Sequence, residues 1–502
     1  MRPPSHALFR FIKKMSPSEK RYFKRFGFSN QKDANQYMLV FNAINNQKEY
    51  NEKALLQQFE GYTFTNNFSE IKKYLYQQLQ RVMRLYNAQK SIDIVLYNHL
   101  SDIAVLYNKE LYSDCEHLIR KATKLATRHE KFNILLLLNE WKRKVVRIDH
   151  HSQGIRDYLA EEAILDQEYI QKVKNESDYF INGLELMLMV RNEGRLNPVQ
   201  YATPELPPLS FRAQRYLLWK RTQQGFLAWD DQMAFEANKK DVLLFEEHPH
   251  FIEAMPKQYV VALSNTINSS IDEQQEIYIE KALKTLNKYP FNIEFKLKEE
   301  LLIRIVQLST AIKSGALARA IEHKNVIDNH LKVMHKKKVI DLTLQLYAEY
   351  EFLKLNILNN EFPTALNHYN SIRQLETKKH QELMFMSTRL MGILIHYHFQ
   401  NWLFLESLIR STTRLLKLKF PNERLAFLFV ETIKRCISIR ISPNIPDEAI
   451  LKELKKLKAE IDSFSSAEIR EEYIIAAWVY SIVLKKPMVV CMSMMKKKIF
   501  YN

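Results

Sequence analysis

Apolar and small residues recur at helical spacing between Ile103 and Ala126. Intervals of three, four and three residues separate Tyr112, Cys115, Ile119 and Ala122, which places them on one face of a helix. Large and small side chains alternate along this face, which we call a ladder, so a second helix can approach closely between the large ones. The pattern predicts two short helices joined at Tyr112-Ser113.

The same spacing returns twice in the second half of the chain. The two later ladders are Phe362, Ala365, Tyr369 and Ile372, and Trp402, Leu405, Ile409 and Thr412. They start 40 residues apart, more than the roughly 34 residues of a regular tetratricopeptide unit. The repetition predicts an all-α fold, a right-handed α-solenoid of degenerate tetratricopeptide-like (TPR-like) helix hairpins.

Composition supports a helical array. Only 8 of the 502 residues are glycine, and no stretch alternates like a β-strand between tight turns. Hydrophobic residues make up 46% of the chain, which is ample for a buried core and excludes global disorder. A chain of 502 residues is too long to fold around one compact core, but a repeat array can accommodate it because its core grows lengthwise.

Helix starts and breaks divide the chain into five segments. Ser16, Pro17 and Glu19 form a helix start with a capping box, and further helices are expected over 34–47, 51–59 and 67–88. The segments are a basic N-terminal helical cap at 1–90, TPR-like hairpins at 91–192, a Pro-rich linker at 193–209, a degenerate helical-repeat solenoid at 210–465, and an apolar terminal helix with a basic tail at 466–502.

Three short helices followed by a long one also fit a DNA-binding helix-turn-helix. Helix 51–59 would then be the recognition helix and would offer Asn51, Gln57 and Gln58 to the bases. Its single lysine, Lys53, is offset by Glu52, so a capping bundle on a solenoid is the preferred interpretation.

Three stretches carry a resemblance to known proteins. Residues 16–24 read Ser-Pro-Ser-Glu-Lys-Arg-Tyr-Phe-Lys, residues 47–55 read Gln-Lys-Glu-Tyr-Asn-Glu-Lys-Ala-Leu, and residues 106–112 read Leu-Tyr-Asn-Lys-Glu-Leu-Tyr. About residues 1–150 resemble a family of bacterial all-helical proteins with degenerate TPR-like repeats. That family has no assigned activity, so the resemblance implies the fold and no chemistry.

If the hairpins stack as in that family, their first helices line a concave face. The resemblance places on this face Tyr97, Leu100, Ala104, Tyr107, Asn108, Tyr347, Tyr350, Lys354, Leu394, Tyr397 and His398. Tyrosines dominate the set and could hold a peptide through ring contacts and hydroxyl hydrogen bonds. The competing interpretation assigns half of these tyrosines to the core or its edge. The expected function is a non-catalytic scaffold or adaptor that binds another protein or peptide.

The net charge of +17 is concentrated at the ends. Residues 1–30 carry +7 and residues 473–502 carry +5, whereas the other 442 residues carry only +5. A body that wrapped nucleic acid would show basic residues along its length. The basic end patch, Lys20, Arg21, Lys24 and Arg25, is either a solvated helix face or a contact for nucleic acid or an acidic partner. The alternative function is therefore a nucleic-acid-associated factor that uses the basic ends.

Residues Tyr473–Leu484 form an expected helix with no charge on any face. Because a solenoid usually ends in a helix with a polar outer face, this one needs a cover. The candidates are the tail at Met488–Met495, a second copy of the chain, and a membrane surface; packing by the tail or a partner is preferred. Two central lysines, Lys485 and Lys486, would cost about 5 kcal/mol or more in a bilayer, so an integral membrane protein is not expected. The run Lys496–Lys498 leaves adhesion to an acidic lipid surface open.

No stretch specifies a reaction. The chain lacks the GxxxxGK[ST], GxGxxG, GxSxG and HExxH motifs, and no cysteine or third histidine near His248 and His250 completes a zinc site. No catalysis, cofactor or metal is expected. The cysteines Cys115, Cys436 and Cys491 are odd in number and far apart, which favours a reducing, cytoplasmic location.

Overall fold

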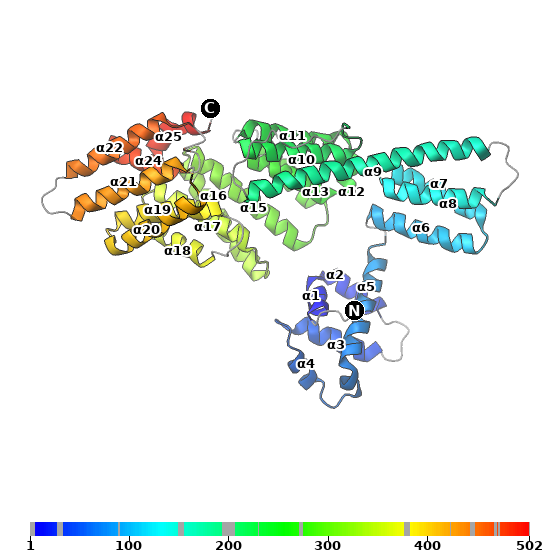
Figure 1. Cartoon of the computed structure of the whole chain (residues 1–502). Helices are drawn as coiled ribbons and strands as arrows, with labels where there is room; N and C mark the ends of the chain where they lie inside the picture. Colours follow the sequence, from blue (N-terminus) through cyan, green and yellow to red (C-terminus); the bar gives the residue numbers. More distant parts are fainter. Residues whose placement is uncertain are drawn as a thin grey trace. The chain divides into compact units, whose positions relative to one another are not determined.

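Every described element of the chain is a helix, which confirms the all-α class (Figure 1). The structure is a computed structural model. It describes residues 6–27, 34–88, 91–148, 155–192, 206–228, 230–270, 275–375, 382–421, 423–441, 447–465, 469 and 472–500.

The chain forms two compact units. Unit 1 comprises Met1–Asp178 and Leu206–Ala213, and unit 2 comprises Tyr179–Glu205 and Gln214–Asn502. The division therefore falls within one 38-residue helix, α9 (Ile155–Asn192). Most of the expected Pro-rich linker, residues 193–205, lies outside the described residues.

Unit 1 starts with a small helical bundle. Its helices are α1 (Ala7–Lys14), α2 (Pro17–Phe26), α3 (Ala34–Asn46), α4 (Glu52–Gln58), the 3-10 helix η1 (Thr63–Asn67) and α5 (Phe68–Tyr86). The unit continues with α6 (Ile92–Asn108), α7 (Tyr112–Arg128), α8 (Phe132–Val146) and the first part of α9. The three helices predicted at 34–47, 51–59 and 67–88 are confirmed to within two residues at each end.

The predicted helix start at Ser16 is confirmed as a capping box. Its Oγ accepts a hydrogen bond from the N–H of Glu19 (3.2 Å), and its own N–H donates to the Glu19 carboxylate (2.7 Å). One turn later Phe23 is fully buried, with its ring 4.9 Å from that of Phe41 on α3. The cap thus fixes the start of a helix whose buried face joins the core of the bundle.

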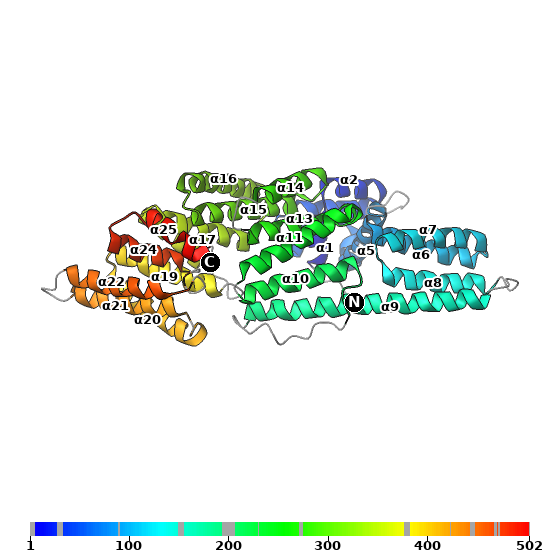
Figure 2. The same cartoon turned by 90° about the horizontal axis from the view of Figure 1, so that it is seen from above.

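Unit 2 is a succession of helices, and from α11 onward each packs against its neighbour in sequence (Figure 2). They are the second part of α9, all but the first three residues of α10 (Phe211–Ala228), α11 (Asp231–Glu247), α12 (Pro249–Ala254), α13 (Pro256–Ser269), α14 (Gln275–Lys288), α15 (Ile293–Lys313), α16 (Leu317–Lys336), α17 (Leu342–Leu358), α18 (Phe362–Leu375), α19 (Glu382–His398), α20 (Trp402–Lys419), α21 (Arg424–Ile441), α22 (Asp447–Ser463), α24 (Tyr473–Leu484) and α25 (Met488–Phe500). In addition, α13 packs on α15 and α15 on α17, so alternate helices also lie side by side.

The three ladders lie on α7, α18 and α20, and they are buried helix faces as predicted. After its first residue, every ladder position is at most 5% exposed. A fourth hairpin, α15 with α16, has the same form, with Leu317, Ala320, Lys324 and Ile327 at the ladder positions. Ala320 and Ile327 are fully buried. The apolar pattern did not reveal this ladder because Lys324 occupies a position that is large and apolar elsewhere.

The four hairpins share one turn. Glu110, Gly315, Asn360 and Gln400 each stand two residues after the first helix and have φ between 56° and 76°. In each turn the following N–H donates to a carbonyl five residues back, as Leu111 does to Leu106 (3.1 Å). This left-handed C-terminal cap reverses the chain within three residues, so the two helices pack closely.

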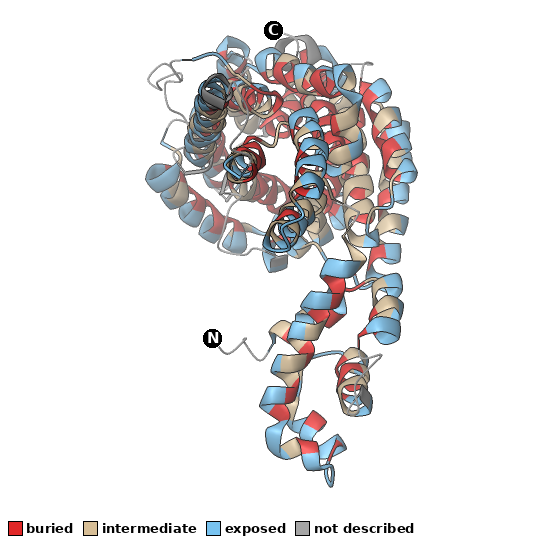
Figure 3. Cartoon of the chain, turned by 90° about the vertical axis from the view of Figure 1, so that its right-hand side faces the viewer, coloured by how far each residue is buried: buried red, intermediate tan, exposed pale blue. Residues whose placement is uncertain are grey.

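Helix α24 is covered by its own chain. It packs against α17, α19, α22 and α25, and each residue from Tyr473 to Tyr480 is at most 8% exposed. Buried residues, red in Figure 3, gather where helices face one another. The predicted cover by the tail is confirmed in α25, and α17 and α19 add contacts that were not predicted. No single described helix is long and apolar enough to cross a membrane. Helix α24 and Met488–Met495 are long and apolar enough only when taken together, and the chain bends by 114° between them.

Candidate functional site

On α6, the predicted partner-binding positions divide into open and packed ones. Tyr97 exposes 59% of its surface, and Asn108 is also exposed. Tyr107 is half-buried, with its ring 5.7 Å from Tyr112 and 5.5 Å from Trp141. Tyr97 and Asn108 are therefore accessible to a partner, whereas Tyr107 belongs to the edge of the core.

On α17, exposure falls along the helix. Tyr347 is 38% exposed, Tyr350 is half-buried, and Lys354 is 4% exposed. The Lys354 ammonium lies 2.6 Å from the carboxylate of Glu351 and 4.6 Å from the ring centre of Tyr350. Lys354 is thus a buried, paired charge and not a surface cation.

On α19, both predicted residues make ring contacts within the chain. Tyr397 is half-buried, with its ring 5.8 Å from that of Trp402. His398 is exposed on one side and stacks on Phe362, with ring centroids 3.8 Å apart and planes 15° apart. Burial lowers the pKa of His398, so this imidazole stacks as the neutral ring near neutral pH.

The predicted faces of α17 and α19 converge on α24. The Tyr397 ring meets that of Trp478 edge-on, with centroids 5.8 Å apart and planes at 86°. The Lys354 ammonium lies 5.7 Å from the ring centre of Tyr473. Phe429 on α21 contacts Trp478 from another side, at 6.0 Å. An aromatic helix therefore already occupies this surface.

Buried polar groups accompany the occupied surface. Glu351 is 8% exposed; one carboxylate oxygen pairs with Lys354, and the other, Oε2, has no hydrogen-bond partner among the described residues. Beside the start of α24, the buried Glu472 carboxylate accepts a hydrogen bond from the Ser387 hydroxyl at 3.3 Å. Removing either member of the ion pair would strand a buried charge, at a cost of roughly 3–5 kcal/mol.

The basic end patch is a cluster of crowded cations. Arg21, Lys24 and Arg25 are exposed and Lys20 is half-buried, and within the described chain none of the four pairs with a carboxylate. Burial lowers the pKa of Lys20, and the nearby charges of Lys13 and Lys24 lower it further. Like charges held this close favour an anionic neighbour.

The candidate DNA-recognition helix, α4, presents few groups. The Asn51 side chain caps the helix by accepting a hydrogen bond from the N–H of Ala54 at 3.0 Å. Glu52 pairs with Lys72 at 2.8 Å, while Lys53, Gln57 and Gln58 remain exposed. Because Asn51 is engaged, two amides and one lysine are left for a base or phosphate.

The chain's thiols are buried. All three cysteines are free and fully buried, and burial raises the pKa of each thiol, that of Cys436 to about 11. A protonated, enclosed thiol is a poor nucleophile. Among the described residues, no three His, Cys, Asp or Glu side chains gather closely enough to hold a metal ion.

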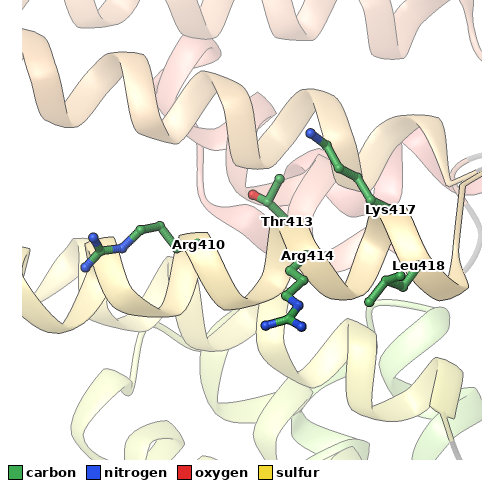
Figure 4. Close-up of a pocket in the computed structure, with 5 residues that line it drawn as sticks. All are labelled: Arg410, Thr413, Arg414, Lys417 and Leu418. Carbon is green, nitrogen blue, oxygen red and sulfur yellow. The ribbon is translucent and has the colours of Figure 1, made fainter.

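A hollow of about 430 Å³ lies beside α20. Its lining residues are Arg410, Thr413, Arg414, Lys417 and Leu418 (Figure 4). These residues lie opposite the buried ladder of α20 and were not among the predicted site residues. Arg410, Arg414 and Lys417 have i, i+4, i+7 spacing in the sequence, which is enough to predict three cations on one helix face.

Comparison with known proteins gives no match to any family model, curated protein or solved structure. The resemblance to bacterial helical proteins with degenerate TPR-like repeats therefore stays a prediction.

Proposed function

We propose that the chain is a non-catalytic protein–protein interaction scaffold, an α-solenoid of degenerate TPR-like hairpins whose first helices bind another protein or peptide. The four hairpins with a shared ladder and turn support the architecture. Side-by-side packing of α13, α15 and α17 is the arrangement that lines up first helices into one face.

The observation that carries the proposal is the aromatic helix held by α17 and α19. Tyr350, Lys354 and Tyr397 are three of the residues predicted to hold a partner, and Lys354 and Tyr397 contact Tyr473 and Trp478 of α24. This surface is chemically suited to a helix that presents aromatic rings. Helix α24 covers this part of the face within unit 2, so a partner would use the positions that stay open.

The open positions are Tyr97 and Asn108 on α6, and Tyr347 on α17. Each tyrosine offers an exposed ring and a hydroxyl, the combination that is enriched at interface hot spots. Tyr97 and Asn108 belong to unit 1 and Tyr347 belongs to unit 2, so the two units are proposed to make separate contacts.

A pull-down with the full chain from its source cell, with and without nuclease, tests the proposal. We expect a stoichiometric protein that survives nuclease and is reduced at least about fivefold by Tyr97→Ala with Asn108→Ala, or by Tyr347→Ala. Tyr62→Ala is the matched control, because Tyr62 is also an exposed tyrosine (49%) but lies outside the predicted face. Unchanged capture by all variants would contradict the proposed face.

The second candidate function, a nucleic-acid-associated factor, is favoured by the crowded cations of the basic end patch. It requires binding of single-stranded or duplex DNA or RNA that weakens steeply with salt. Lys20→Glu, Arg21→Glu and Lys24→Glu together would then abolish the binding. Loss of the captured protein on nuclease treatment would move this function to first place.

A further inference from the structure

The outward face of α20 carries a row of unpaired cations. Arg410, Arg414 and Lys417 are exposed and lie on one stripe, opposite the buried ladder residues Leu405 and Leu416. None of the three forms an ion pair or hydrogen bond with another described residue. Their Cα atoms span about 10 Å along the helix axis.

Exposed leucines bracket this row. Leu403 is 89% exposed and Leu418 is 72% exposed, the two most exposed large hydrophobic residues of the described chain. They lie at the two ends of the same stripe, about 22 Å apart along the axis. A single exposed leucine is ordinary, but two that flank unpaired cations and a hollow of about 430 Å³ define a surface with apolar ends and a basic centre.

Helix stability alone does not explain the row. Cations in the last turn, such as Lys417, interact favourably with the helix macrodipole. Arg410 stands in the middle of α20, where that effect has faded, and the single acid of the helix, Glu406, does not pair with it. The charges of this face therefore have no partner in the part of the chain that the structure describes.

We propose that this face of α20 docks an acidic amphipathic helix of another protein. Carboxylates of the partner at i, i+4 and i+7 would oppose Arg410, Arg414 and Lys417, and an apolar residue at each end would cover Leu403 and Leu418. Three cations on a 10 Å row neutralise too few phosphates for tight nucleic-acid binding. A lipid surface fits less well, because the apolar side of α20 is packed inside unit 2 and Leu403, Phe404 and Leu418 are its only exposed large apolar residues. The surface is distinct from the first-helix face, so it adds a second contact to the scaffold.

The test uses the full chain and a fluorescein-labelled helical peptide of about 18 residues, with glutamates at i, i+4 and i+7 and leucines at both ends. We expect anisotropy to report binding that the triple variant Arg410→Glu, Arg414→Glu, Lys417→Glu weakens at least about tenfold. The variant Leu403→Ser with Leu418→Ser should weaken it as well. A peptide with glutamine in place of glutamate should not bind.

Two controls make the result decisive. The matched triple Lys121→Glu, Lys124→Glu, Arg128→Glu reverses the same number of exposed charges on α7 and should leave peptide binding within about twofold. The milder Arg410→Gln, Arg414→Gln, Lys417→Gln should fold as the wild type does and still lose binding, which separates the contact from a folding defect. Equal binding by wild type and both α20 triples would overturn the proposal. So would an α20 triple that loses binding to single-stranded DNA or to phosphatidylserine vesicles but keeps binding to the peptide.

Discussion

Gly392 shows how one missing side chain positions two helices. A Cβ at Gly392 on α19 would overlap Cε2 and lie 2.7 Å from Cζ of Tyr369, a buried ladder residue on α18. We expect Gly392→Ala to lower the free energy of unfolding by about 1–2 kcal/mol, because overpacking outweighs the better helix propensity of alanine. Urea denaturation followed by circular dichroism measures this difference.

The control is a double-mutant cycle with Tyr369→Leu. In that background the ring is gone, so Gly392→Ala should cost much less than in the wild type. An equal cost in both backgrounds would show that the close approach of the Tyr369 ring is not the reason for the glycine.

At the scale of the element, local signals predicted most helices. The ladder spacing and the Ser16 capping box depend only on residues within one helix, and both are present in the structure. Helix α1 was missed, because its eight residues follow no capping residue: His6 makes no capping hydrogen bond through its side chain. The candidate site was only partly predictable, because the contacts of Tyr397 and Lys354 with α24 join residues some 80 to 120 positions apart. No periodicity along the chain reports such contacts.

The cover of α24 can be tested through Trp478. Its ring is 6% exposed and contacts Tyr397 and Phe429. We expect Trp478→Ala to lower the free energy of unfolding by about 3–5 kcal/mol, as truncation of a buried aromatic residue does. Urea denaturation gives this value, and size-exclusion chromatography with light scattering gives the mass of the particle.

Self-association through Tyr473–Leu484 leads to a different result. A second copy could use this helix only if it left its contacts with α17 and α19. Trp478→Ala would then lower the mass of the particle and have little effect on the stability of the monomer. Tyr97→Ala serves as the comparison, because that exposed ring should change unfolding by less than about 0.5 kcal/mol.

At the scale of the whole molecule, buried ionisable groups make stability depend on pH in two opposing ways. Burial lowers the pKa of His99, His323 and His396 below the ordinary value near 6.5. Burial raises the pKa of the carboxyls Glu176 and Glu299. The histidines therefore have no effect on stability well above pH 6.5 and destabilise the fold as the pH falls below it. The two carboxyls destabilise the fold where they ionise and cease to do so in acid.

His396 allows the first effect to be isolated. Its imidazole is 8% exposed, lies 4.3 Å from the Phe404 ring, and has its Nδ1 3.2 Å from the Asn401 amide; burial lowers its pKa first, and the charge of Arg373 lowers it further. Because the unfolded state takes up the proton more readily, acidification from pH 7.5 to 5.5 should destabilise the wild type more than His396→Gln. Urea midpoints followed by tryptophan fluorescence at both pH values measure the two differences. The carboxyls contribute equally to both proteins and cancel, so equal losses would mean that His396 takes up its proton as easily in the folded chain as in the unfolded one.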